Sequence, residues 1–587
     1  MMSFTICYKR AGDAWRLSFS GAHRDAPSPI EYDESRGMML LGERFGVPLA
    51  TVFDAPWQNN PVVVNELGIA ANLIAFDSAG CVFATDTTGR ELLFYYTSDE
   101  FFVLSDSFWD ILKIVQPSFD DLDGEVVEEM ISTGCGVPCD FTTPIKGLRW
   151  AYPNMLGRFD AATGSFRTRQ FSEVRRTAEV RDIDEAVDGL HRSMRDMAET
   201  LTEQFSGQKL GLGLSGGLDS RVALHYLQEA GADLTCFNTC TTRPHKVLIA
   251  HSVAKSRALA KAANIEYREV EWRPDSVREK MDQMLEMQPL GTTGHYTNVY
   301  KYEPAGLPDF DVLVTAGQGI GPYLVGVSAA SGSDAWTRDD VLGYLLGLSH
   351  ASAQPYSFTI HSIRKQLSKM GLKRLDTAKG PEYLQWKKIA TDDAHGRVAR
   401  KVAAFVDDRL AKGYRPADIT LDFRTSTLGA IGRNGAYESS LGRFRNFTIY
   451  TPFLVREGLK WDIPLIEDRR VLKELVKREI PEFANVGEEE VGSIGSTGSL
   501  ALFANKFEFV ARGSGIMAEE WYRGHPAIRK AFDEDMGNDC AWFYELVPGA
   551  RAVDSVWRMS PARKNSIWEM KRLVDCIETQ RYLEFKH

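Results

Sequence analysis

One stretch, Leu214–Arg221 (LSGGLDSR), limits what this chain can fold into more than any other. It follows the short apolar run KLGLGLS, which favours a buried strand. It precedes RVALHYLQEAG, whose apolar spacing predicts a helix that stops near Gly231. A strand, a glycine-rich turn and a helix in succession are typical of phosphate loops in parallel α/β sheets. The Walker pattern G-x-x-x-x-G-K-[ST] is absent from the sequence, so any phosphate loop here is of another type.

The residue types in this stretch suit an anion. Gly216 and Gly217 allow a tight turn that brings backbone N–H groups close to a phosphate. The helix that begins near Asp219 directs the positive end of its dipole to the same place, and Ser215 and Ser220 can donate hydroxyls. Asp219 repels a phosphate unless it holds a Mg²⁺ that bridges to it. The alternative is an ordinary helix N-cap, in which Ser and Asp bond their own backbone.

The surrounding sequence predicts two domains of different character. Residues 1–172 contain short β-type runs such as FTICY, GMMLLGERF and ELLFYYTS, as in a layered β-sheet domain, with a hairpin turn at Asp160–Ser165. In 173–587, the runs ADLTCFNT, IEYREVEW and DVLVTAGQG alternate with helical patterns, which predicts a doubly wound parallel sheet. Asp182 is the expected N-cap of the first helix, and residues 336–430 and 455–587 are expected to be mostly helical.

Charge and composition exclude several classes of protein. Among 587 residues the net charge is −11, which gives no bulk attraction to nucleic acid or anionic lipid. No apolar run has the length of a membrane helix, and the N-terminus lacks the pattern of a secretory signal. The eight cysteines have no zinc spacing and are expected to be reduced, buried thiols of a cytoplasmic protein.

The string Ser215–Ser220 resembles the pyrophosphate loop of the ATP-pyrophosphatases, specifically of the asparagine-synthetase family. Three further stretches are similar to that family: residues 136–164 to the end of its N-terminal domain, Cys236–Thr239 to its adenine-side strand, and Thr451–Leu454 with Ile463–Pro464 to its P-F-L-D segment. The resemblance implies a glutaminase-like (Ntn-type) first domain and an ATP-pyrophosphatase synthetase domain. It extends thinly over nearly the whole chain.

The resemblance also implies a reaction and a set of residue roles. ATP and a carboxylate would give an acyl-adenylate and pyrophosphate, and an amine would then displace AMP. The implied roles are adenine and ribose contacts for Leu214, Phe237 and Thr239, pyrophosphate and metal binding for Ser215, Gly216, Gly217, Leu218, Asp219 and Ser220, and an approach to the α-phosphate for Gly317 and Gly319. ATP and Mg²⁺ are the implied cofactors, with Asp219 as the metal ligand.

The sequence departs from the family at the N-terminal nucleophile. Family glutaminases use a Cys exposed by removal of the initiator Met, whereas Met2 and Ser3 occupy these positions here. Cys7 lies within a strand pattern and cannot supply a free α-amine. We therefore expect no glutamine hydrolysis. Ring-forming relatives, the β-lactam synthetases and lasso-peptide cyclases, share this loss.

Two further departures concern the synthetase site. The family's second Mg²⁺-binding Asp is replaced by Gly321, with Asp334 as a weak substitute. The late loop Glu488–Ser499 resembles an active-site loop but begins with acids, so Lys506 is the nearest basic group in sequence. The loop Glu488–Ser499 is either an active-site lid or a solvated surface loop.

Four other residues have a catalytic interpretation and a structural one. Tyr437 and Glu438 form a candidate proton relay, against a plain surface Glu beside a core Tyr. Arg221 is a candidate to contact a phosphate or the substrate carboxylate, against a surface ion pair. His225 is expected to pack or cap.

The sequence thus predicts an ATP-dependent carbon–nitrogen ligase without glutaminase activity. Macrolactam formation on a peptide is favoured, because the nucleophile is lost and the long helical segment 336–430 offers room for a peptide. The alternatives are a β-lactam-type synthetase with a small substrate, an ammonia-dependent asparagine synthetase, and a nucleotide-binding scaffold. Expected partners are a peptide or small carboxylate substrate and a precursor-peptide-binding or protease protein; nucleic acid and membranes are not expected.

Overall fold

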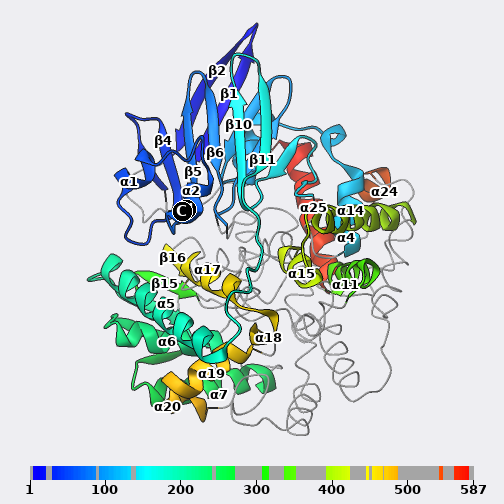
Figure 1. The fold of residues 1–587 in the computed structure, drawn as a ribbon. Helices are drawn as coiled ribbons and strands as arrows, with labels where there is room; N and C mark the ends of the chain where they lie inside the picture. The colour runs from blue at the N-terminus through cyan, green and yellow to red at the C-terminus, as the bar shows by residue number, and fades with distance from the viewer. Residues whose placement is uncertain are drawn as a thin grey trace.

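The computed structural model describes residues 4–21, 30–87, 91–133, 140–240, 246–271, 307–315, 336–351, 392–423, 445–448, 452–466, 469–486, 541–546 and 561–580. Within these ranges the chain forms three sheets (Figure 1). Two are antiparallel and precede residue 171, and the third is parallel. The mixed α/β class predicted from the sequence is confirmed, including the parallel sheet.

The N-terminal part is built on two antiparallel sheets, with orders β2-β1-β8-β7-β9 and β11-β10-β6-β5-β4-β3. The strands are β1 Phe4–Ala11, β2 Ala14–Gly21, β3 Ile30–Asp33, β4 Met38–Glu43, β5 Ala70–Asp77, β6 Gly80–Ala84, β7 Phe94–Thr97, β8 Phe101–Ser105, β9 Leu148–Trp150, β10 Met155–Asp160 and β11 Ser165–Gln170. The predicted hairpin turn is present between β10 and β11, where Asp160 pairs with Ser165 and its carboxylate accepts from the Ala162 and Thr163 amides.

The two sheets pack face to face over an aromatic core. Phe102 of β8 and Phe159 of β10 stack between them, with ring centroids 4.4 Å apart. In β4, Met39 faces this core while Leu40 faces helices on the outer side of the same sheet. The run MMLL is therefore continuously apolar because both faces of β4 are buried.

Helices cover the outer faces of both sheets. They are α1 Leu49–Asp54, α2 Val62–Glu66, α3 Phe108–Val115, η1 Phe119–Asp121 and α4 Gly124–Thr133. Val52 and Val64 of α1 and α2 share a core with β4 and β5, and Phe108 of α3 packs edge-on against Phe94 of β7. The order of layers is thus helix, sheet, sheet, helix. The predicted layered β-sheet character of residues 1–172 is confirmed.

The third sheet has the order β14-β13-β12-β15-β16, and every neighbouring pair is parallel. Its strands are β12 Leu210–Gly213, β13 Leu234–Cys240, β14 Tyr267–Glu271, β15 Val312–Thr315 and β16 Arg445–Thr448. The chain runs outward from β12 through β13 to β14, then crosses back and continues on the other side through β15 and β16. This reversal is the mark of a doubly wound sheet.

Helices bury the two faces of this sheet unequally. Leu210, Leu212 and Leu214 face a large core formed with helices α5, α6, α17 and α19, whereas Gly211 between them faces Phe310. The predicted N-cap of α5 is confirmed, because the Asp182 carboxylate accepts from the Asp184 and Glu185 amides. The helices here are α5 Ile183–Gln204, α6 Leu218–Glu229, α7 Lys246–Ala262, α17 Pro452–Lys460, α18 Ile463–Ile466, α19 Arg470–Glu479 and α20 Pro481–Ala484.

A separate group of helices lies beside both sheet systems. It comprises α11 Arg338–Ala351, α14 Asp392–Ala411 and α15 Pro416–Phe423, which share a core, together with α24 Ala541–Leu546 and α25 Pro561–Thr579 near α4 (Figure 1). In the ranges that the structure describes, residues 336–430 and 455–587 are helical as predicted.

The segment between β11 and α5 connects the N-terminal sheets to the parallel sheet. Thr177 and Val180 donate backbone hydrogen bonds to Leu459 and Lys460 at the end of α17. Phe45 and Ala70 of the N-terminal part belong to the large core around β12. The predicted boundary near residue 172 falls in this segment, after β11 ends at Gln170.

Among the described residues, no helix has the length and apolar character needed to cross a membrane. Cys7, Cys81 and Cys236 are buried thiols, as predicted for them.

Candidate functional site

The loop after β12 lies where the order of strands in the parallel sheet reverses: the chain adds β13 and β14 on one side of β12, and β15 and β16 on the other. β12 lies between β13 and β15, the first strands of the two arms. In open parallel sheets, ligands bind outside the carboxyl ends of the strands at such a switch point. The topology therefore makes Leu214–Gly217 the expected position for a ligand, independently of the residue types found there.

The two serines of the loop hold its shape. The Ser220 hydroxyl donates to the Ser215 carbonyl over 3.0 Å and accepts from the Ser215 amide over 3.1 Å. The Ser215 hydroxyl lies 3.1 Å from the Ser220 hydroxyl and accepts from the Gly217 amide over 3.1 Å. Ser220 is 3% exposed, so its hydroxyl serves the loop's own backbone.

Helix α6 begins directly behind this turn. Its N-cap residue is Gly217, and no side chain caps the first turn at that position. A helix start without a side-chain cap presents backbone N–H groups to whatever lies in front of it. The alternative interpretation, in which Ser and Asp cap the helix with their own side chains, is met only in part: the Ser215 hydroxyl accepts from the Gly217 amide, but no side chain caps α6 at Gly217. A Cβ at Gly217 would lie 3.1 Å from the Ser215 hydroxyl, so the loop is closely packed there.

Arg221 fixes the loop from behind. Its side chain is fully buried, and its guanidinium donates to the carbonyls of Phe483 and Val486 over 2.8 Å each and of Gly216 over 3.1 Å. The guanidinium is directed into the interior, and its predicted contact with a phosphate or substrate carboxylate stays a prediction. A surface ion pair is ruled out by this burial. Arg221 instead positions Gly216 and ties the loop to the end of α20.

The residues expected around adenine lie in the core. Leu214 and Phe237 are each 1% exposed, and Phe237 stacks on Phe310 with centroids 5.7 Å apart. The Leu214 amide donates to the Phe237 carbonyl, and the Leu214 carbonyl accepts from the Ser256 hydroxyl over 2.7 Å. Both side chains are thus part of the core beside the loop, and their predicted contacts with adenine stay predictions. Thr239 lies in β13, and its side chain is not among the described parts.

Asp219 sits in the first turn of α6 and is partly exposed. A carboxylate there lies at the helix start, where a Mg²⁺–phosphate complex would be held. The described residues contain no cluster of three or more metal-binding side chains. Asp219 as the metal ligand stays a prediction.

Several predicted site residues lie outside the described ranges. They are Met2, Ser3, Gly317, Gly319, Gly321, Asp334, Tyr437, Glu438, Glu488–Ser499 and Lys506. Their predicted roles stay predictions.

His225 and Cys7 have packing environments. The His225 ring packs edge-on against Tyr226 and Phe483, and its nitrogens each lie 3.5 Å from a carboxylate, of Glu229 and Glu482. Cys7 lies inside β1, paired with β2 and β8, and burial raises the pKa of its thiol. Its position within a strand agrees with the expectation that it is no N-terminal nucleophile.

Sequence reasoning missed a polar relay beneath the loop. The Asn238 amide nitrogen donates to the Ser256 hydroxyl over 2.8 Å, and that hydroxyl donates to the Leu214 carbonyl. Ser256 is fully buried in α7. A polar residue on the buried face of an otherwise apolar helical pattern is the signal that could have identified it.

Comparison with known proteins gives two kinds of result. No protein-family model and no curated protein matches this chain. Among solved structures, the glutamine phosphoribosylpyrophosphate (PRPP) amidotransferase from B. subtilis, complexed with ADP and GMP, matches with 10% identity over 40% of this chain and a TM-score of 0.17. The match spans 59% of that enzyme's length. A structure described as the allosteric regulatory enzyme of purine biosynthesis matches with 9% identity over 47% of this chain and 71% of its own, with a TM-score of 0.18. TM-scores this low establish no shared fold.

Proposed function

We propose that this chain is an ATP-dependent ligase that adenylates a carboxylate and lets an amine displace AMP to form an amide. The observation that carries the proposal is the position of the S-G-G-L-D-S string at the switch point of a doubly wound parallel sheet. The residue types of the loop and the strand order of the sheet each indicate, by separate arguments, that a ligand binds at Ser215–Ser220. Support is added by the α6 N-cap Gly217, which leaves the helix start without a side-chain cap.

In this proposal the loop residues bind and orient the leaving diphosphate. The backbone around Gly216 and Gly217 and the first turn of α6 would hold it, because N–H groups converge there. Asp219 would hold Mg²⁺, which supplies charge neutralisation at the phosphates when bound. Ser215, Ser220 and Arg221 would keep the loop in a single shape, so little reorganisation is needed during the reaction.

We further propose that the ligase is of the asparagine-synthetase type and closes a macrolactam on a peptide. The layered first domain would be a glutaminase-like domain that does not hydrolyse glutamine, since Cys7 is held in the middle of the β1 sheet pairing. The amine would then be part of the substrate. The residue resemblance given above supports this finer assignment.

The test is exchange of radiolabelled pyrophosphate into ATP in the presence of candidate peptides bearing a free N-terminus and an Asp or Glu side chain. We expect Asp219→Asn to lower exchange by about a hundredfold, the scale typical of losing one charge-stabilising group. Asp184→Asn is the matched control, because Asp184 is also a first-turn acid but belongs to α5. Equal exchange in wild type and Asp219→Asn would contradict the proposal.

The same assay separates the alternatives. AMP formation with free aspartate and ammonia would identify an ammonia-dependent asparagine synthetase. AMP formation with a small β-amino-acid-type carboxylate alone would identify a β-lactam-type synthetase. Binding of ATP without AMP release by any substrate would identify a nucleotide-binding scaffold.

A further inference from the structure

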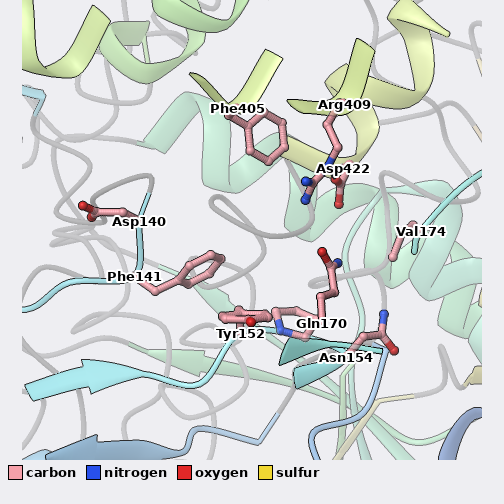
Figure 2. A pocket seen from close by; sticks show the side chains of 10 residues that line it. Asp140, Phe141, Tyr152, Asn154, Gln170, Val174, Phe405, Arg409 and Asp422 are labelled. Atoms are coloured by element: carbon pink, nitrogen blue, oxygen red, sulfur yellow. Dashed lines mark hydrogen bonds and ion pairs between the residues drawn. The ribbon is translucent and has the colours of Figure 1, made fainter. Parts of the chain in front are cut away.

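A second candidate site lies away from the phosphate loop, where the N-terminal part meets α14 and α15 (Figure 2). It is a cavity of about 180 Å³. One wall comes from the segments around Tyr152, Asn154 and Gln170, and the opposite wall from Phe405, Arg409 and Asp422. A cavity of this volume is large enough for one small organic molecule.

Asn154 contributes a buried hydrogen-bond donor to this cavity. The residue is 0% exposed, and its side-chain oxygen accepts from the Asn65 amide over 2.9 Å. The Thr87 hydroxyl lies 3.1 Å from the same oxygen and 2.6 Å from the Asn65 side-chain oxygen, so its one hydrogen is shared between the two amides. The Asn65 donor holds the Asn154 amide in this orientation. Its nitrogen, on the side that faces Val174 in Figure 2, has no hydrogen-bond partner among the described residues. A buried donor without an acceptor is costly, which points to an acceptor supplied by a ligand.

The backbone of the same wall is held in an unusual conformation. Asn154 has a φ of 58° and Phe141, which also lines the cavity, has a φ of 58°. Left-handed backbone at a residue other than glycine costs free energy and occurs where the surrounding structure enforces it, often at functional sites. The side chains of both residues line the cavity (Figure 2).

The charges around the cavity are already paired. Arg409 donates through Nε to Asp422 over 2.5 Å and also binds Asp408, and its guanidinium lies 4.6 Å from the Phe405 ring centroid. Asp140 forms an ion pair with Lys401, whose Nζ lies 3.1 Å from Oδ2 of Asp140. A ligand with a net charge would leave one charge uncompensated in a largely buried space. The cavity therefore suits an uncharged ligand.

Aromatic rings form much of the remaining surface. Phe141 and Tyr152 are neighbours with centroids 5.3 Å apart, and Phe405 lies on the opposite wall. Flat aromatic walls with a few placed polar groups are typical of pockets for planar small molecules.

We propose that this cavity binds a small, uncharged, planar molecule that carries a hydrogen-bond acceptor, the chemical class of an aromatic amide. The acceptor meets the Asn154 amide nitrogen, and the plane lies among the aromatic rings. The site is separate from the proposed ligase chemistry. Because one wall comes from the segment just before β10 and the end of β11, and the other from α14 and α15, an occupant joins the two parts of the chain.

Three probes of the same shape test the ligand class. Benzamide has both the plane and the acceptor, benzoate adds a charge, and toluene lacks the acceptor. We expect saturable benzamide binding in titration calorimetry or ligand-observed NMR, with a Kd on the order of 1 mM for so few atoms. Benzoate and toluene are expected to bind about tenfold more weakly or worse. Absence of benzamide binding at about 10 mM, or benzoate binding as tight as benzamide, would overturn the proposal.

Variants show whether binding occurs in this cavity. Gln170→Phe fills it from the wall, and Gln208→Phe makes the same change at an exposed loop position. Asn154→Gly removes the donor while keeping a residue that tolerates a positive φ. We expect benzamide affinity to fall at least about tenfold in Gln170→Phe and in Asn154→Gly and to stay unchanged in Gln208→Phe. If Asn154→Gly fails to fold, Gln170→Phe decides, and unchanged affinity in it refutes the site.

Discussion

At the scale of single residues, several side chains act on partners that lie far away in the sequence. Arg221 reaches Phe483 and Val486, and the Asn154 amide meets Asn65 and Thr87. These contacts decide what each residue does, since the same arginine on a helix surface would have been a candidate ligand. A buried guanidinium that donates to three backbone carbonyls is instead part of the support of the loop.

Asp106 gives a prediction for the pH dependence of stability. It follows β8, and burial raises the pKa of its carboxyl to about 8, with Asp110 and Glu91 adding to the rise and the Phe4 amide opposing it. The folded state thus holds the proton more tightly than the unfolded state, whose pKa is near 3.8. Its stabilising contribution is complete below that value and is lost as the pH rises through about 8.

Asp106→Asn keeps an acceptor for the Phe4 amide but does not ionise. Between about pH 5 and about pH 8, we expect wild type to lose on the order of 2 kcal/mol more stability than the variant, less than the linkage maximum because the residue is partly exposed. Urea unfolding midpoints at both pH values measure this. Asp99→Asn, in an exposed turn, is the control. Parallel pH profiles of wild type and Asp106→Asn would contradict the assignment.

The role of some residues could be predicted from their neighbours in the sequence, and the role of others could not. The turn carboxylate of Asp160 and the N-cap of Asp182 act on amides two and three residues away, so their roles could be predicted from spacing. Arg221 also binds the nearby Gly216 carbonyl, but its other two carbonyl partners, Phe483 and Val486, are 262 and 265 residues away in the sequence. No periodicity within α6 contains that information, and the same holds for the Asn154 donor.

At the scale of elements, β12 owes its place to alternating leucine and glycine. The leucines face the core under α5 and α6, while Gly211 lies against the Phe310 ring. A strand with small residues on one face allows close approach of a bulky neighbour, and here that neighbour precedes β15. The strand, the turn and α6 were predictable because their residues repeat at the periods of strand and helix. The strand order was not predictable from any one element, because it depends on which strands pair.

Gly211→Ala tests this packing. A Cβ at Gly211 would lie 2.4 Å from Cδ1 of Phe310, so the ring must move. We expect a loss of about 1 to 3 kcal/mol in the free energy of unfolding, as found for overpacked cores, measured by chemical denaturation.

Adding Phe310→Leu to Gly211→Ala should recover part of that loss, because the smaller side chain makes room. A double variant whose destabilisation equals or exceeds the sum of the single changes would argue against a direct clash.

At the scale of the whole molecule, ion pairs join the helical group to the N-terminal part. Arg397 of α14 lies 2.8 Å from Glu128 and 3.4 Å from Glu129 of α4, and Lys401 lies 2.7 Å from Glu129. Both glutamates are 3% exposed. The sequence patterns predicted the helical group and the N-terminal sheets separately. The position of one relative to the other depends on these long-range ion pairs, which leave no pattern in either segment's local sequence.

Arg397→Met removes the positive charge from two buried carboxylates. We expect a destabilisation of about 3 kcal/mol, because breaking a buried pair leaves an uncompensated charge. Arg400→Met, one turn away on the exposed side of α14, should change stability by less than about 0.5 kcal/mol. Thermal and urea denaturation of both variants measure the difference, and similar stability of the two would refute a role for this interface.

The shared core of Phe45 and Ala70 with the helices around β12 has a consequence for how such a chain can change over generations. Deleting everything before residue 171 would uncover the apolar surface that these two side chains seal. The shortened protein would expose this apolar surface to solvent and would tend to aggregate. The residues before 171 are therefore a structural requirement of the rest of the chain, whatever chemistry they perform.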